Sequence, residues 1–222
     1  MPRLLIVNGD DFGLSAGVNE GIVKAHTDGV LTSTSLMVLA PAAAQAARAA
    51  TEHPELSVGL HFVEDGSVNL DDPDQASLAF HSQLKRFREL TGRDPTHVDS
   101  HHHVHRERMS TFEALVEPLR VPLRSDGRVA YVGGFWAQWE PGVTNLDYVR
   151  RAFLLELVRS EVLEGFTELA CHPARITGDF SSSYLEEREV ELATLTEPGL
   201  REEIESCGVR LVSYHDLPSS IS

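Results

Sequence analysis

At 222 residues and 41% apolar content, the chain is long enough for one domain with a real core, and we expect residues 1–222 to form it. A membrane span needs about 18 consecutive apolar residues, and no apolar run in the chain is that long. The formal net charge of −15 argues against nucleic acid as a partner. The two cysteines, Cys171 and Cys207, form no CxxC motif, and the N-terminus lacks a signal-peptide pattern. We therefore expect a cytoplasmic protein with reduced thiols.

Short apolar runs typical of strands alternate with longer amphipathic segments typical of helices. The expected strands are residues 3–8, 34–40, 56–62, 96–99, 167–171 and 209–214. The expected helices are residues 15–28, 41–53, 71–91, a short one near 110–117, 145–164, one that begins near 183, and 198–207. Strands that alternate with helices indicate βα units and a mainly parallel sheet. With one or two further strand-like runs in the segment 119–143, the total of about seven or eight strands favours a distorted or incomplete (β/α) barrel, an α/β fold, over an open sheet.

Several helix ends carry recognisable signals. Ser15 is typical of an N-cap, and Gly92 is typical of a helix stop. The patterns Ser110 to Glu113 and Ser183 to Glu186 both predict capping boxes. Residues 119–143 have no clear pattern, and we expect part of this segment to form a loop over the site.

Two adjacent acids, Asp10 and Asp11, follow the first apolar strand. Carboxylates at a strand end are costly to bury unless a cation holds them. Because adjacent strand residues point in opposite directions, one acid could bind a metal while the other stays free as a base. The alternative is an acid pair that the N-terminus of the next helix stabilises.

Histidines follow three further strands, which places them at the same edge of a parallel sheet. His61 ends the third strand, and alone it could be an ordinary core residue. The segment 97–105 contains five histidines and one aspartate, namely His97, Asp99, His101, His102, His103 and His105. Several neutral imidazoles in one segment favour metal binding, with Asp99 as a carboxylate that orients one ring. His172, before Pro173, is a weaker signal of the same kind.

Two other classes of function remain open at this point. A non-haem iron oxygenase could use His97-x-Asp99 and a distal histidine as a facial triad, although such triads are usual on jelly rolls. A non-catalytic metal-binding protein could use His101 to His105, but it would leave Asp10 and His172 without a role.

The sequence resembles the YdjC-like carbohydrate deacetylases, the ChbG/HpnK group, almost from end to end. The motifs that carry the resemblance are LIVNGDDFG at 5–13, the glycine- and threonine-rich stretch at 21–35, GLHF at 59–62, THVDSHHHVH at 96–105, ELACHP at 168–173 and EREVELA at 187–193. Two segments depart from the family pattern: residues 64–75 are compressed, and residues 106–140 match poorly. The resemblance implies a distorted α/β barrel and the metal-dependent removal of an N-acetyl group from an amino sugar.

Carried over by motif, the resemblance implies Asp11, His61 and His101 as metal ligands, with Asp10 as the catalytic base. It implies His172 as a candidate acid, with His103 as the alternative. A carboxylate with two imidazoles does not select one metal, so we expect one divalent ion, either Mg or Zn, with Mn, Co or Fe as alternatives. The expected partner is a small acetylated amino-sugar substrate, and the sequence does not indicate an oligomeric state.

Overall fold

In the computed structural model, which describes residues 1–140 and 142–218, seven strands form one sheet in which every pairing is parallel. The strands are β1 (Arg3–Phe12), β2 (Ser33–Leu36), β3 (Ser57–Phe62), β4 (Val98–Ser100), β5 (Ala130–Val132), β6 (Gly165–Cys171) and β7 (Val209–Leu211). Their order is β4-β3-β2-β1-β6-β5, and β7 pairs with the start of β1. Carboxyl ends of parallel strands share one edge, so residues that follow these strands meet there.

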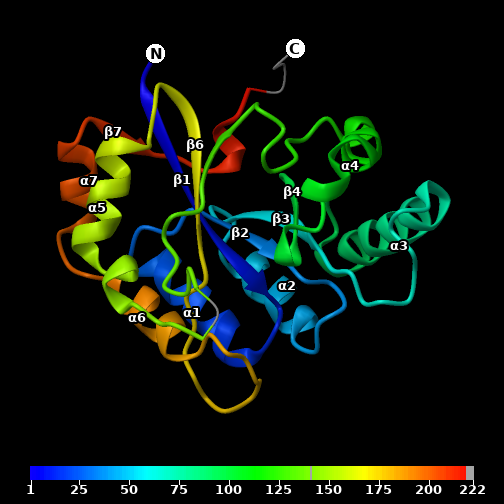
Figure 1. Ribbon diagram of the computed structural model, residues 1–222, viewed down its shortest axis with the longest axis horizontal. Helices are drawn as coiled ribbons and strands as arrows, with labels where there is room; N and C mark the ends of the chain where they lie inside the picture. Colours follow the sequence, from blue (N-terminus) through cyan, green and yellow to red (C-terminus); the bar gives the residue numbers. More distant parts are fainter. Residues whose placement is uncertain (141, 219–222) are drawn as a thin grey trace.

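The helices surround this sheet, with α5 and α7 on one side and α3 and α4 on the other (Figure 1). They are α1 (Ala16–Thr27), α2 (Ala43–Glu52), α3 (Pro73–Thr91), α4 (Met109–Val116), α5 (Arg151–Ser160), α6 (Glu186–Leu195) and α7 (Leu200–Ser206). The mainly parallel sheet covered by helices confirms the predicted α/β class. Within the described part of the chain, no helix is long and apolar enough to cross a membrane.

The sheet curls toward a barrel beyond its formal edges. Residues 122–124 run parallel to β4, because Val98 N donates to Pro122 O and Arg124 N donates to Val98 O, each at 2.9 Å. Six residues later the chain enters β5, which pairs with β6 on the other side of β1. This short connection brings the two ends of the sheet near each other and places Arg124 between them.

The apolar core explains why these elements form. Phe62 on β3 contacts Phe80 on α3 and Phe112 on α4, with ring centroids 6.5 and 5.2 Å apart. All three side chains are fully buried, as is Phe87, so the periodic face of α3 packs inward as its spacing predicts. Fully burying such a side chain contributes about 1.5–3 kcal/mol, which outweighs the modest helix propensities involved.

Several element ends differ from the predictions. The second strand ends at Leu36 rather than at residue 40, and the predicted helix at 145–164 is a 3₁₀ turn at Leu146–Val149 followed by α5. Both predicted capping boxes are wrong: α4 begins after Arg108 and α6 after Leu185, and neither has a side-chain cap. The predicted cap at Ser15 is confirmed, since its hydroxyl accepts from Val18 N at 3.2 Å. The first residues of α4 and α6 are therefore determined more by the packing of their apolar faces than by capping patterns.

Candidate active site

Asp10 and Asp11 lie at the carboxyl end of β1, and both line the same large cavity. The expectation that they point in opposite directions is wrong. The register between β1 and β2 shifts between Gly9 and Phe12, and Asp11 has a φ of 68°. This left-handed conformation, rare for a residue with a side chain, turns the backbone so that both carboxylates face one space.

Asp11, His61 and His101 come together from three separate strand ends, as predicted. One ligand atom from each lies within 4.8 Å of the others, which is the spacing of a metal site. His101 Nδ1 lies 3.1 Å from Asp11 Oδ1, and His61 Nε2 lies 3.4 Å from the same oxygen. The other oxygen of Asp11 accepts from Arg188 Nη2 at 2.6 Å. Burial alone would raise the pKa of Asp11, but these partners hold it well below its usual range.

His61 is oriented by a carboxylate on the next strand. Its Nδ1 lies 2.7 Å from Asp99 Oδ1 and 3.1 Å from Ser35 Oγ, which leaves Nε2 directed at Asp11. Burial alone would lower the pKa of His61, but the surrounding carboxylates, chiefly Asp99, raise it to about 10. A histidine whose second nitrogen is fixed by a carboxylate is the usual arrangement of a metal ligand in proteins.

Arg124 joins the carboxylates of three strands. It donates to Asp10 on β1 through two hydrogen bonds of 2.7 Å, and its Nη2 lies 2.6 Å from Asp99 Oδ2 on β4 and 2.5 Å from Glu168 Oε1 on β6. The guanidinium is fully buried, and Tyr214 donates to the free oxygen of Glu168 at 2.7 Å. Burial by itself would raise the pKa of Asp10, but Arg124 and His61 together outweigh it and lower the pKa, so Asp10 is ionised at neutral pH.

His172 and His103, the two predicted acids, both line the cavity. His172 Nε2 lies 4.0 Å from Asp10 Oδ2, and its ring packs against Trp136, 5.1 Å between centroids. His103 Nε2 lies 3.4 Å from the hydroxyl of Tyr131. Burial is the main cause that lowers the pKa of each histidine to about 4, so both imidazoles are neutral at neutral pH.

The remaining histidines of the cluster have separate environments. His102 is exposed, and its ring centroid lies 3.8 Å from that of His101 in a tilted arrangement. His105 is buried with Nδ1 2.6 Å from Ser100 Oγ. His97 stacks on Tyr214 at 3.9 Å, and it fills the space over Gly59, where a Cβ would approach its ring to 2.5 Å.

These positions do not favour the two alternatives. Among the described residues, the potential metal-binding groups contain His101 but not His102, His103 or His105. This argues against the hypothesis that the segment 101–105 stores metal. His97 belongs to no such group, and the fold is α/β rather than a jelly roll, which argues against the facial triad.

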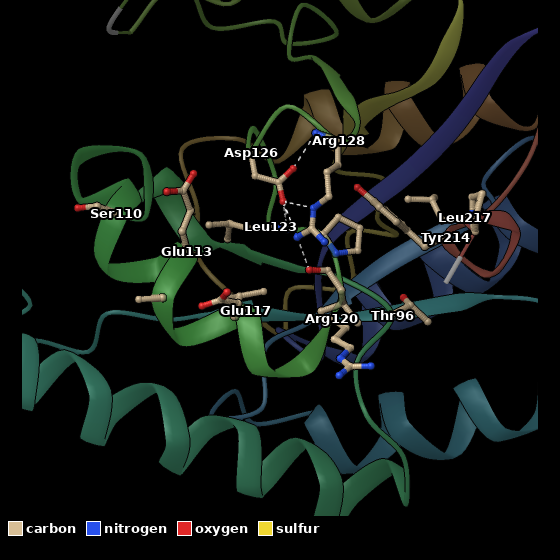
Figure 2. Close-up of a pocket in the computed structure, with 15 residues that line it drawn as sticks. Thr96, Ser110, Glu113, Glu117, Arg120, Leu123, Asp126, Arg128, Tyr214 and Leu217 are labelled. Atoms are coloured by element: carbon tan, nitrogen blue, oxygen red, sulfur yellow. Dashed lines mark hydrogen bonds and ion pairs between the residues drawn. The ribbon is translucent and has the colours of Figure 1, made fainter. Parts of the chain in front are cut away.

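The cavity that these residues line has a volume of about 1140 Å³ and extends from the strand ends to the segment 131–139. A second cavity of about 940 Å³ lies between α4, residues 120–128 and Tyr214 (Figure 2). The described residues that line it include no histidine or cysteine, and its Asp126 is paired with Arg128 at 2.7 Å. The acids and histidines that could bind a metal or transfer a proton line the first cavity, which is therefore the candidate functional site.

Four charged residues at the site were not identified from the sequence: Arg124, Glu168, Arg188 and Glu191. Glu168 could have been found, because it is a lone charge in an otherwise uncharged strand. Glu191, in the motif at 187–193, accepts from His172 N and, at 2.6 Å, from the hydroxyl of Tyr184. Burial raises the pKa of Glu191 to about 8.

Comparison with known proteins supports this picture. The chain is 38% identical to a carbohydrate deacetylase of Geobacillus stearothermophilus, with 97% of this chain and 98% of that protein aligned. It is 34% identical to a chitooligosaccharide deacetylase of Yersinia enterocolitica, with 97% and 100% aligned. A crystal structure from Enterococcus faecalis V583, of a protein named for a proposed cleavage of cellobiose phosphate, has 25% identity and a TM-score of 0.79 over 97% of this chain and 98% of that chain.

A cobalt-bound family 4 acetyl xylan esterase of Clostridium thermocellum shares the fold, with a TM-score of 0.58 at 15% identity over 98% of this chain and 94% of that one. The family model of the YdjC-like proteins matches residues 4–75 and 66–206, which include every candidate site residue described above. The chain therefore belongs to the YdjC-like family.

Proposed function

We propose that this chain is a metal-dependent hydrolase that removes an N-acetyl group from an amino sugar or a short oligosaccharide. The observation that carries the proposal is the convergence of Asp11, His61 and His101 beside the ionised carboxylate of Asp10 in one cavity. The names of the family's relatives, carbohydrate and chitooligosaccharide deacetylase, support the same chemistry.

The residues present fit a divalent cation. One carboxylate oxygen and two imidazole nitrogens lie close enough to share an ion, and Asp99 orients one of the rings. This mixed set of oxygen and nitrogen donors suits Mg or Zn, with Mn, Co or Fe as alternatives, and does not distinguish among them. When bound, the metal would supply Lewis-acid polarisation of the acetamide carbonyl and of a water molecule.

Asp10 is the proposed base that takes a proton from the attacking water. Arg124 fixes both of its oxygens, and Asn8 Nδ2 donates to Oδ1 at 2.8 Å, so the carboxylate is held in one orientation. Holding the base in place before the substrate arrives removes part of the entropic cost of the reaction. Because the pKa of Asp10 is lowered, the base form persists at neutral pH.

His172 is the proposed group that returns a proton to the leaving amine. Its ring is neutral in the free protein, so it must receive a proton during the reaction rather than carry one beforehand. Its position 4.0 Å from Asp10 suits such a transfer, with a small movement or one bridging water. His103 lines the same cavity and is the alternative donor.

The proposal is tested by measuring acetate release from N-acetylglucosamine and its β-linked oligosaccharides. The protein is first stripped of metal and then supplied with Mg, Zn, Mn, Co or Fe in turn. We expect acetate release that depends on one of these metals. Absence of release from every acetylated amino sugar, with metal bound, would contradict the proposal.

A further inference from the structure

The cavity is larger than the proposed reaction requires. Roughly 300 to 1,000 Å³ accommodates most drug-sized ligands, and one acetylated sugar ring is smaller than these. The cavity of about 1140 Å³ therefore has room beyond the ring that carries the reacting acetamide. This inference rests on the proposed function, since it concerns the rest of the same substrate.

The two parts of the cavity differ in chemistry. The strand ends supply acids and imidazoles, among them Asp10, Asp11 and His172. Most of its aromatic side chains come from the segment 131–139, from the 3₁₀ turn before α5 and from α5 itself; they are Tyr131, Phe135, Trp136, Trp139, Tyr148 and Phe153, and Tyr184 completes the set. Three consecutive serines, residues 181–183, also line it and offer hydroxyl groups. Aromatic faces beside polar hydroxyls are a surface that matches sugar rings, which have apolar C–H faces and polar edges.

Trp139 is the aromatic side chain that stands out in this set. Its side chain is 59% exposed, whereas Trp136 stacks on Tyr184 with 3.8 Å between centroids. Within the described part of the chain, Trp139 has no aromatic partner and its indole N–H makes no hydrogen bond. An exposed indole on a cavity wall leaves apolar area in water that a ligand could cover.

Hydrogen bonds hold the two residues that precede Trp139. The preceding residue, Gln138, donates from its side chain to Ser183 O at 2.7 Å and to Glu187 Oε1 at 2.6 Å. Ala137 N donates to the hydroxyl of Tyr184 at 3.1 Å, and Asn145 N donates to Ala137 O at 2.8 Å. The backbone that leads to the indole is thus fixed, which reduces the ordering entropy lost when a ligand stacks on it.

We propose that Trp139 is a specificity-determining residue that stacks on a second or third sugar ring, so that the enzyme favours oligosaccharides over the monosaccharide. The ring that fits best is one with equatorial substituents, because its axial C–H bonds then form flat apolar faces on both sides. β-linked N-acetylhexosamine chains meet this requirement.

The test compares kcat/KM for acetate release from N-acetylglucosamine and from its β-linked trisaccharide. In Trp139→Ala, we expect the ratio of trisaccharide to monosaccharide to fall about three- to tenfold, the range that one aromatic contact gives. Most of that change should be in KM. Trp139→Phe should recover most of the ratio, and Leu78→Ala, at an apolar side chain exposed on α3, is the matched control. A ratio unchanged in Trp139→Ala, or equal losses on both substrates, would overturn the proposal.

A binding measurement separates this inference from the proposed function. The chain has two tryptophans, so a change in intrinsic fluorescence that is present in the wild type and lost in Trp139→Phe reports on Trp139. We expect the trisaccharide to produce that change even in Asp10→Asn, which should not turn over. If the metal-loaded wild type binds the trisaccharide with this signal but releases no acetate, the proposed reaction is contradicted and the subsite is retained. Acetate release without the signal would contradict the subsite and retain the reaction.

Discussion

The guanidinium of Arg124 holds the carboxylate of Asp10 at two points: Nη1 donates to Oδ2 and Nη2 to Oδ1, each over 2.7 Å. The same guanidinium contacts Asp99, which in turn orients His61. One buried cation therefore fixes the proposed base and, through Asp99, a proposed metal ligand. The position of the base and that of the metal site are coupled through this residue.

Replacing Arg124 should destabilise the fold and disturb the site together. In Arg124→Met, three buried carboxylates lose their shared cation, and breaking a buried pair in this way typically costs about 3–5 kcal/mol. Chemical denaturation measures the free energy of unfolding. The control is Arg128→Met, whose partly exposed pair with Asp126 should contribute about 1 kcal/mol or less. Equal losses in the two variants would contradict a special role for Arg124.

His61→Ala should remove most of the bound metal, because it deletes one of three donors and leaves Asp11 and His101 to hold the ion alone. Elemental analysis of the purified variant measures the metal content per chain. His81→Ala, an exposed histidine on α3, is the control. If the His61 variant holds as much metal as the wild type, the proposed ligand set is wrong.

Asp10→Asn should keep its metal and lose about a hundredfold or more in kcat, the usual scale for a general base. Asparagine keeps the size of the side chain but cannot take up a proton. Metal content and acetate release are measured on the same preparation. Full activity would refute the assignment of Asp10 as the base, and loss of metal would assign it to the ligand shell instead.

Glu191 should make stability depend on pH. Its pKa rises from 4.5 to about 8 on folding, mainly through burial, so the folded state favours the protonated form. Between about pH 4.5 and 8 the unfolded chain ionises first, and this contribution to stability is present at low pH and lost as the pH rises. Glu191→Gln cannot ionise there.

The free energy of unfolding of Glu191→Gln, relative to the wild type, should therefore increase with pH across this range, by an amount on the order of a few kcal/mol. Denaturation at several pH values measures it, and Glu186→Gln, at an exposed position on the same helix, is the control. A difference that does not vary with pH would show that Glu191 is ionised in the folded protein.

The sequence predicted the parts of the fold and site that depend on local patterns. Strand–helix alternation predicted the parallel sheet, and acids and histidines at strand ends predicted one shared site. The family resemblance then selected Asp11, His61 and His101, which do meet. Arg124 could not be assigned in this way, because it lies in a segment without a clear pattern and joins β1, β4 and β6 only after the sheet curls. A single shift of register at Asp11 likewise reversed the expected direction of one carboxylate, and no periodicity reveals such a shift.

The central claim, a deacetylase that works through one metal at Asp11, His61 and His101, is tested most directly by titration of the metal-free protein. Acetate release from a β-linked N-acetylglucosamine oligosaccharide is followed as divalent metal is added. We predict that the rate rises from near zero and reaches a plateau at about one metal ion per chain, the stoichiometry of a single three-donor site. A rate that is already maximal in the metal-free protein, or a chain that binds metal fully and releases no acetate, would contradict the claim.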